Sequence, residues 1–406
     1  MNTKVFFTTA LLFTASVTSA FAVAQKVANS AIYVNGTWYY CATDLGFTNG
    51  GAFNGANLGV LESLQLGGQS QAWDGNGHWN GGGQVQMSYK IDNGTEKVLY
   101  LDYWALQYYN NSNETWMKFQ SGGGTFTPST IDISGLAEGN HTLAVWFHCD
   151  DAWDSNNGNN FVASFTTPYK VANSGDISRV SNLSDGNPVA VQLDGLTLYK
   201  DGYWNSLCLP FNLTKSQYDQ SPIKGAEIRE LSSASVSGST LTLNFSNVSA
   251  SQDNDPLLEA GKPYIIKWEN DNSTIQNPVF TGVNLITTGA GSVPGEGVTF
   301  KGTFDQINCS STDNYLFVSD NNTLCYPDNG AKILPFRAYF DLGTTSPAGI
   351  KAINLNFGDE ENGIFLMEDG RSKMEDAYFT LDGRRLLSQP ITPGLYIHNG
   401  RKVMIK

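Results

Sequence analysis

Hydrophobic and polar residues alternate with a period of two along most of this chain. Such alternation predicts β-strands with one buried face, because successive side chains of a strand point to opposite sides. Clusters of Gly, Asn, Asp and Pro separate the runs and mark turns. Long helical periodicity is absent, and the best helix candidate is a short stretch from Thr214, a suitable N-cap, to Tyr218. The pattern predicts an all-β protein, with immunoglobulin-like or jelly-roll-like β-sandwich domains in tandem and a small C-terminal β-meander.

The run from Thr142 to Cys149 shows the two faces of one expected strand. Its apolar members should face the core: Leu143, Val145, Phe147 and Cys149. Trp146 and His148 alternate with them and should point away from that core. The residues around it, Ile131 to Leu136 and then Gly139-Asn140-His141-Thr142-Leu143, resemble the E–F region of immunoglobulin-like or fibronectin-like sandwiches. That resemblance implies an architecture and leaves function open.

The start of the chain predicts export. Lys4 precedes an apolar run from Val5 to Phe13, and two overlapping A-x-A sites follow, so we expect a signal peptide cleaved after Ala24. The apolar run is shorter than the ~20 residues of a membrane span, and no later stretch is apolar enough to cross a bilayer. We therefore expect a secreted chain with no transmembrane segment in its mature part.

Shifts in composition divide the chain further. The expected segments are a signal peptide at 1–24, an aromatic-rich β-sandwich domain at 25–168, a linker at 169–186, a second β-sandwich or stalk domain at 187–357, an acidic linker at 358–373 and a C-terminal module at 374–406. Charged residues make up only 15% of the chain, against a typical ~25%. The net charge of −14 argues against nucleic acid as a partner, because an acidic surface repels phosphates.

Seven of the nine tryptophans precede residue 169, and several lie in polar, Gly-rich loops. Sugar rings stack their C–H faces on flat aromatic rings, while Asp, Asn and His exchange hydrogen bonds with sugar hydroxyls. The loops therefore predict a ligand site for a glycan or a host surface molecule. Its candidate residues are Trp73, Asp74, His78, Trp79, Trp146, His148, Trp153 and Asp154. The alternative is that these tryptophans plug the open ends of the sandwich, because Trp is usually highly buried.

A second hypothesis concerns metal binding in the loop after the strand at 142–149. Four residues there carry hard oxygen ligands of the kind that calcium prefers: Asp150, Asp151, Asp154 and Asn156. The spacing departs from that of an EF-hand, since Gly158 stands at the third ligand position. A solvated polar loop is the alternative, and the sequence requires no cofactor.

The five cysteines are Cys41, Cys149, Cys208, Cys309 and Cys325. Export permits disulfides, and Cys309–Cys325 and Cys41–Cys149 are the two conceivable bridges. The alternative is that all five are small buried hydrophobic residues. Cys208 lies in the apolar string Leu207-Cys208-Leu209, which suits a buried thiol better than an activated one.

Motifs for catalysis are missing from the sequence. It has four histidines, no Gly-x-Ser-x-Gly elbow and no His-Glu-x-x-His. Glycosidase carboxylates leave no local signature, so a secreted glycan-active enzyme stays open as an alternative. We nevertheless expect a protein that is not an enzyme.

Three strings in the second domain carry a family resemblance. They are Trp204-Asn205-Ser206-Leu207-Cys208-Leu209-Pro210-Phe211, Gly261-Lys262-Pro263-Tyr264 and Phe336-Arg337-Ala338-Tyr339-Phe340. Together they resemble a module near the C-terminal end of many secreted surface proteins of Bacteroidota, with Ser206 where Thr is usual. The resemblance implies an all-β stalk or spacer and brings no catalytic residues.

The C-terminal module predicts a four-stranded meander, because Asp382-Gly383 and Asn399-Gly400 are strong hairpin signals. Its strings resemble the C-terminal sorting domain of type IX secretion cargo. The residues that carry this resemblance are Asp382, Gly383, Gly394, Asn399, Gly400 and Lys406. The resemblance implies the type IX secretion machinery as a partner and the cell surface as the destination. The alternative is an ordinary terminal pair of hairpins.

These observations favour a non-catalytic protein of the cell surface that binds a glycan through its N-terminal domain. A structural spacer without a specific ligand is the competing hypothesis.

Overall fold

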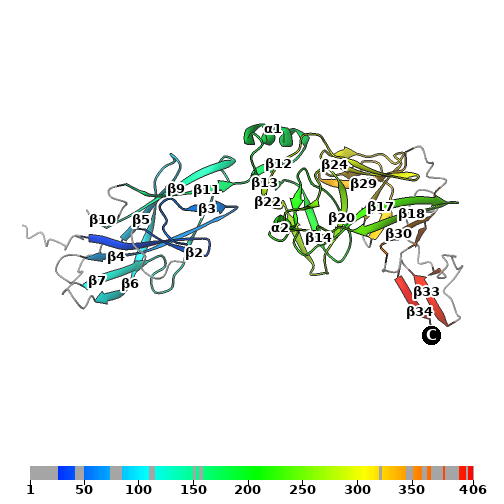
Figure 1. The fold of residues 1–406 in the computed structure, drawn as a ribbon. Helices are drawn as coiled ribbons and strands as arrows, with labels where there is room; N and C mark the ends of the chain where they lie inside the picture. The colour runs from blue at the N-terminus through cyan, green and yellow to red at the C-terminus, as the bar shows by residue number, and fades with distance from the viewer. Residues whose placement is uncertain are drawn as a thin grey trace, which may run out of the picture. The chain divides into compact units, whose positions relative to one another are not determined.

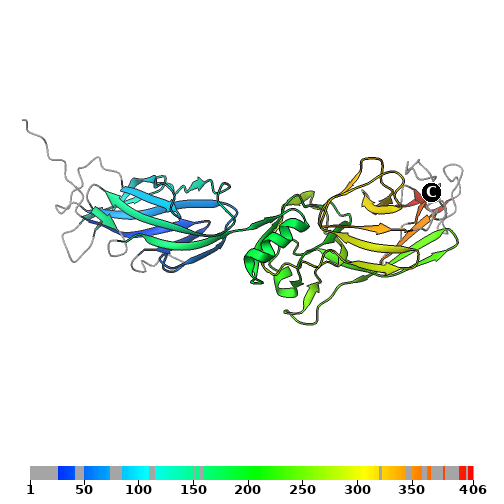
Figure 2. The same ribbon diagram turned by 90° about the horizontal axis from the view of Figure 1, so that it is seen from above.

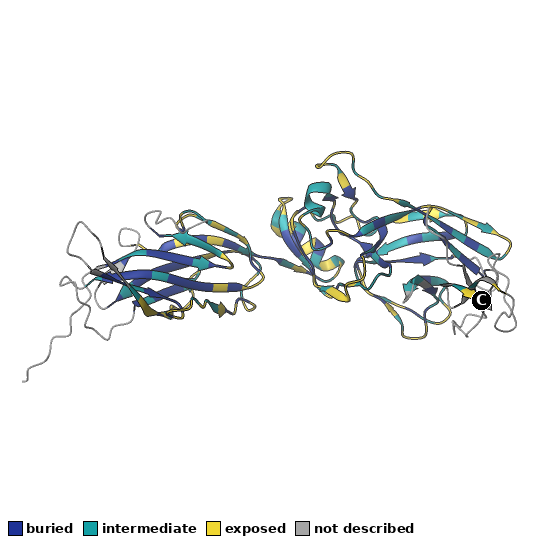
Figure 3. Cartoon of the chain, turned by 90° about the horizontal axis from the view of Figure 1, so that it is seen from below, coloured by how far each residue is buried: buried dark blue, intermediate teal, exposed yellow. Residues whose placement is uncertain are grey.

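The computed structural model describes residues 26–41, 50–73, 85–108, 115–149, 152–154, 159–319, 322–343, 350, 352–358, 364–366, 378–379, 393–398 and 401–405. Nearly all of its regular structure is β, as the alternation predicts. The chain forms two compact units, 1–167 and 168–406. Buried residues follow the strands of both units (Figure 3). None of the helices described is long and apolar enough to span a membrane.

The first unit is a sandwich of two sheets that share one long strand (Figure 1). The first sheet contains β2 (Thr37–Tyr40), β1 (Lys26–Val34), β4 (Leu64–Trp73), β7 (Thr115–Gln120), β8 (Ser129–Ile131) and the second half of β6 (Lys97–Tyr108). The second contains the first half of β6, β5 (Val85–Ile91), β9 (Gly139–Cys149), β10 (Ala152–Asp154), β11 (Phe161–Thr167) and β3 (Asn57–Val60). β6 passes from one sheet to the other, as strands do at the corners of orthogonal packings.

The core of the first unit lies between these two sheets. Leu64, Leu66 and Phe119 enter it from the first sheet, and Met87 and Phe147 from the second. The expected core face of β9 is confirmed, because Leu143, Val145, Phe147 and Cys149 are all at most 1% exposed.

His141 secures the start of β9 from a buried position. Its Nδ1 lies 2.8 Å from Asp92 Oδ2, and its Nε2 lies 2.8 Å from the carbonyl oxygen of Ala137. Asp92 Oδ1 also accepts the backbone N–H of Thr142 at 2.8 Å. Burial tends to raise the pKa of Asp92, but the hydrogen bonds from His141 and Thr142 lower it below the ordinary value. The Asp92 turn and the entry into β9 are thereby tied together.

The second unit contains a larger sandwich. Its six-stranded sheet has the order β15 (Asn205–Cys208), β20 (Pro263–Lys267), β17 (Glu227–Ser237), β18 (Thr240–Asn247), β30 (Ala352–Asn356) and β31 (Ile364–Leu366). The five-stranded sheet has the order β23 (Ser292–Gly295), β24 (Val298–Thr303), β29 (Arg337–Asp341), β26 (Tyr315–Ser319) and β27 (Thr323–Cys325). Leu241 and Leu355 of the six-stranded sheet meet Phe300 and Phe340 of the five-stranded sheet in one core.

Smaller sheets complete the second unit. They are β12 (Tyr169–Val171) with β13 (Val189–Leu193) and β22 (Val279–Val283); β14 (Thr197–Lys200) with β21 (Ser273–Gln276); β16 (Leu213–Thr214) with β19 (Pro256–Leu258); and β25 (Ile307–Asn308) with β28 (Lys332–Ile333). The short helix α2 (Lys215–Tyr218) confirms the expected helix, and Thr214 forms a capping box with Gln217.

The linker predicted at 169–186 is wrong, because that segment belongs to the fold of the second unit. It contains β12 and helix α1 (Ser174–Ser184), the long green helix of Figure 2. Asn173 caps α1 by accepting the N–H of Asp176, and Ile177 and Val180 are buried beneath it. The expected linker at 358–373 likewise contains β31, which pairs with β30.

At the C-terminus, β32 (Tyr378–Phe379), β33 (Gly394–His398) and β34 (Arg401–Ile405) form a small antiparallel sheet. His398 pairs with Arg401, the register expected of a two-residue hairpin at 399–400. Asn399, Gly400, Asp382, Gly383 and Lys406 themselves lie outside the described residues, as does the expected strand after Gly383.

Candidate functional site

The tryptophans proposed from the loops do not share one surface among the described residues. Trp73 ends β4 in the first sheet of the first unit, whereas Trp146 and His148 lie on β9 in the second. Trp153 lies on β10, and the structure does not describe its side chain. Asp74, His78 and Trp79 lie outside the described residues.

Trp146 and His148 are poor candidates for contacting a ligand. Trp146 is only 7% exposed, so it offers no open ring face for stacking. His148 is half-buried, its Nε2 lies 3.4 Å from Ser88 Oγ, and burial lowers its pKa. For Trp146, burial is therefore the correct alternative.

Asp154, named for both the ligand site and the calcium site, is a buried carboxylate. Its Oδ2 accepts the backbone N–H of Ser30 at 3.1 Å, and burial raises its pKa. Within the part of the chain that the structure describes, no group of His, Cys, Asp and Glu is arranged to hold a metal ion. Asp150, Asp151 and Asn156 lie outside that part, so the calcium hypothesis stays a prediction.

The prediction of buried cysteines is confirmed for Cys41, Cys149, Cys208 and Cys309, whereas Cys325 is only partly buried. All five are described, and the structure contains neither the Cys309–Cys325 nor the Cys41–Cys149 bridge. Cys208 Sγ donates to the carbonyl oxygen of Gly261 at 3.2 Å, and burial raises the pKa of Cys208 to about 12. That confirms a buried, unactivated thiol. Burial also raises the pKa of Cys41 and that of Cys309.

A groove lies instead on the outer face of the first sheet of the first unit, and we call it the tryptophan groove. Its volume is about 200 Å³, and it is lined by Asn29, Trp38, Gln69, Ser70, Gln71, Trp104, Lys118 and Phe119. Enclosed ligand pockets usually measure ~300–1,000 Å³, so this groove suits one segment of a larger ligand.

The alternation of β4 produces the floor of the groove. Leu64, Leu66 and Ala72 face the core, so Gln69 and Gln71 must point to the outer face. Across β7, Gln69 pairs with Gln120 and Gln71 pairs with Lys118. The floor is therefore a row of polar side chains on a rigid sheet.

Two irregularities in the strands help to shape the walls. In β1 the register shifts between Ala28 and Ala31, and Asn29 adopts a positive φ of 56°. Asn tolerates that conformation better than most residues do. In β6 the register shifts between Tyr103 and Ala105, at Trp104. Bulges of this kind redirect side chains, and Trp104 remains 39% exposed.

Hydrogen bonds fix the amide groups of the floor. Asn29 Nδ2 donates to Gln71 Oε1 at 2.8 Å, and Gln69 Nε2 donates to Gln120 Oε1 at 2.7 Å. These bonds hold the amide groups in fixed orientations along the floor. The floor is therefore preorganised, which lowers the entropic cost of binding.

The two tryptophan walls are held by different contacts. Trp38 packs against Phe126 and Tyr33, with ring centroids 4.8 Å and 5.4 Å away. Lys118 Nζ lies 5.4 Å from the centre of the Trp104 ring, a cation–π distance. Both rings therefore present aromatic surface at fixed positions beside the polar floor.

Trp73 lies farther along the same sheet face, beside Trp116, although Trp116 is only 7% exposed and, like Trp146, offers no open ring face. Trp73 stacks on Trp116 with ring centroids 6.2 Å apart and an angle of 22° between the planes. Trp73 follows Gln71 by two residues in β4, and Trp116 precedes Lys118 by two in β7, so all four share a face. Of the loop candidates whose side chains the structure describes, Trp73 is the one that shares this sheet face with the groove.

Sequence reasoning missed the tryptophan groove, although part of its signal was present. Gln69 and Gln71 alternate with core residues, but any solvated strand shows the same pattern. Trp38 and Trp104 lie 66 residues apart in the sequence, and only strand order brings both to one groove.

Comparison with known proteins adds no further assignment. No protein-family model, curated protein or solved structure matches this chain.

Proposed function

We propose that the first unit binds a glycan in the tryptophan groove, outside the cell. The observation that carries this proposal is the placement of Trp38 and Trp104 around a hydrogen-bonded floor of Asn29, Gln69 and Gln71. Aromatic rings bind the C–H faces of sugars, and amides bind their hydroxyls in both directions. The described residues that line the groove include no carboxylate, which favours binding over hydrolysis.

The test is a glycan array probed with the purified protein, followed by calorimetric titration with the best glycan. Trp104→Ala is expected to weaken binding at least about tenfold, or ~1.4 kcal/mol, because it removes one stacking surface. Tyr100→Ala is the matched control. Tyr100 is 56% exposed and belongs to the part of β6 that pairs with β5, in the other sheet. Equal losses in the two variants, or binding to no glycan, would contradict the proposal and favour a spacer.

We further propose that the C-terminal module directs the protein through type IX secretion to the cell surface. This rests on the resemblance of the strings around Asp382-Gly383 and Asn399-Gly400 to the sorting domain of type IX secretion cargo. Deleting residues 374–406 in the native host is expected to abolish surface display, measured by antibody labelling of intact cells. The control is the Met404→Ala variant. Met404 is 64% exposed, so this variant should still be displayed at the cell surface. Unchanged display of the deleted form would refute the sorting role.

A further inference from the structure

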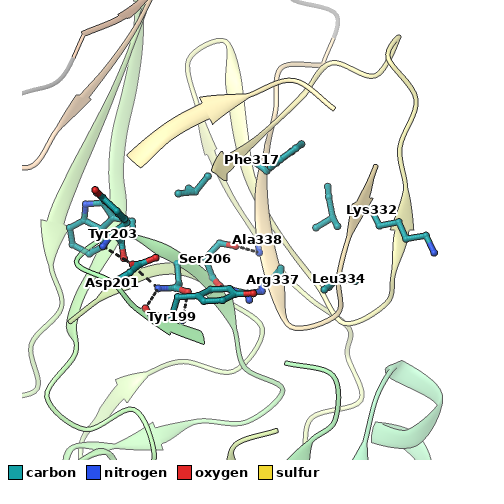
Figure 4. A pocket seen from close by; sticks show the side chains of 13 residues that line it. Tyr199, Asp201, Tyr203, Ser206, Phe317, Lys332, Leu334, Arg337 and Ala338 are labelled. Atoms are coloured by element: carbon teal, nitrogen blue, oxygen red, sulfur yellow. Dashed lines mark hydrogen bonds between the residues drawn. The ribbon is translucent and has the colours of Figure 1, made fainter. Parts of the chain in front are cut away.

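A second pocket lies in the second unit, and none of its described lining residues lines the tryptophan groove. Its volume is about 220 Å³. Figure 4 shows the side chains that line it. The walls include Tyr199, Asp201, Tyr203, Lys332, Leu334 and Arg337. It forms where the string 204–211 meets the string 336–340, two of the three strings singled out in the sequence.

Arg337 is the central group of this pocket. Its Nη1 donates to the carbonyl oxygen of Ser206 at 3.1 Å, and its Nη2 donates to that of Thr197. A guanidinium carries five N–H donors, so donors remain after these two bonds. The same contacts orient the planar group in a fixed direction.

Among the residues that the structure describes, no carboxylate forms an ion pair with Arg337. Burial lowers the pKa of Arg337 to about 10, which leaves the group charged at neutral pH. A partly desolvated charge without an opposite charge is costly, and an anionic ligand would offset that cost.

The backbone is strained directly before Arg337. Phe336 has a φ of 62°, a left-handed conformation that is a genuine outlier for a bulky residue. Its N–H donates to the carbonyl oxygen of Thr303 and its own carbonyl accepts the N–H of Cys208, both at 2.8 Å. Strain of this kind is concentrated at functional sites.

The other walls combine a second cation with aromatic surface. Lys332 is exposed, and Tyr199 is 50% exposed, with its ring beside Arg337 in Figure 4. Of the described residues that line the pocket, Asp201 is the acidic one, and its Oδ1 accepts the N–H of Tyr203 at 2.9 Å. The lining thus offers the guanidinium of Arg337 for an anion, rings for C–H groups and the carboxylate of Asp201 for a hydroxyl. Lys332 lies at the far edge of the pocket, with its side chain directed away from Arg337 in Figure 4.

We infer that this pocket binds an acidic sugar, with the carboxylate on the guanidinium of Arg337 and the sugar ring against Tyr199. A guanidinium matches a planar carboxylate through two parallel hydrogen bonds. Lys332 adds long-range attraction that salt should screen.

The test is calorimetric titration of the full-length purified protein with sodium glucuronate, and with glucose as the uncharged comparison. Glucuronate is expected to bind saturably and at least tenfold more tightly than glucose, and more weakly at high salt. Equal binding of the two sugars, or no saturable binding of glucuronate, overturns the inference. Sodium succinate binding as tightly as glucuronate overturns the sugar part, because the carboxylate alone would then suffice.

Variants separate binding from folding. Arg337→Gln should weaken glucuronate binding at least tenfold, and Lys332→Ala, at an exposed position, should weaken it several-fold without affecting thermal stability. Arg229→Gln is the matched control, since Arg229 is also largely covered but pairs with Glu227 away from the pocket. A folded Arg337→Gln variant, or a Lys332→Ala variant, that binds like the original protein overturns the assignment.

Discussion

Replacing Phe340 with alanine is expected to lower the free energy of unfolding of the second unit by about 3–5 kcal/mol. Phe340 and Phe300 are a direct cross-strand pair between β29 and β24, and both are at most 1% exposed. Their rings stack with centroids 4.4 Å apart and an angle of 12° between the planes. Phe245, from the facing sheet, meets both rings edge-on at 6.4 Å and 6.3 Å. Alanine would leave a cavity among rigid rings that cannot close over it.

Hydrogen–deuterium exchange resolved by peptide is the appropriate measurement, because it reports the two units separately. Amides of β24 and β29 should lose protection, while those of β9 in the first unit serve as the internal reference. Leu183→Ala is the control: Leu183 is 62% exposed, and its replacement should change stability by less than about 0.5 kcal/mol. A loss below about 1 kcal/mol for Phe340→Ala would contradict the packing described for this core.

Replacing Asn205 with alanine is expected to cost the second unit about 2–4 kcal/mol, even though the substitution removes little apolar surface. Asn205 is only 6% exposed. Its Oδ1 accepts the N–H of Tyr199 at 2.9 Å, and its Nδ2 donates to the carbonyl oxygen of Tyr199 at 2.8 Å. Alanine leaves both peptide groups without these partners in a covered site. The loop between β14 and β15 would then lose the residue that closes it.

Hydrogen–deuterium exchange of peptides from the second unit, measured over a urea series, would measure this loss. Asn187→Ala is the matched control, since the exposed Asn187 donates only to the carbonyl oxygen of Ser184. The control should change stability by less than about 0.5 kcal/mol. If the two asparagine variants were equally stable, Asn205 would be a surface residue in solution and its role in the loop would be wrong.

The strings that stood out in the sequence prove to be neighbours in space. Cys208 pairs with Pro263 between β15 and β20, and the N–H of Ala338 donates to Ser206 Oγ at 3.2 Å. Packing explains the residue types of the first string. Trp204 stacks on Phe357, and Leu207 and Cys208 are fully buried. The string order alone could not reveal that the same contacts leave a pocket at Arg337.

Helix α1 shows why local sequence patterns can miss a helix that tertiary packing stabilises. Asn173-Ser174-Gly175 is typical of a turn, and the helix that follows has few apolar residues. A helix of 11 residues is marginal by itself in water, and burial of Ile177 and Val180 stabilises it here. The sequence held the N-cap at Asn173, but the decision between turn and helix depended on a surface that other strands build.

What the sequence determined by itself is local and periodic: the all-β class, the inward face of β9, the capped helix at Thr214 and the two-residue register between His398 and Arg401. These follow from side-chain alternation and turn chemistry, which act over a few residues. Tertiary structure decided the rest. Trp146 is covered, Trp38 and Trp104 share a groove, and Arg337 faces a pocket, because strand order and bulges bring together residues that the sequence keeps far apart.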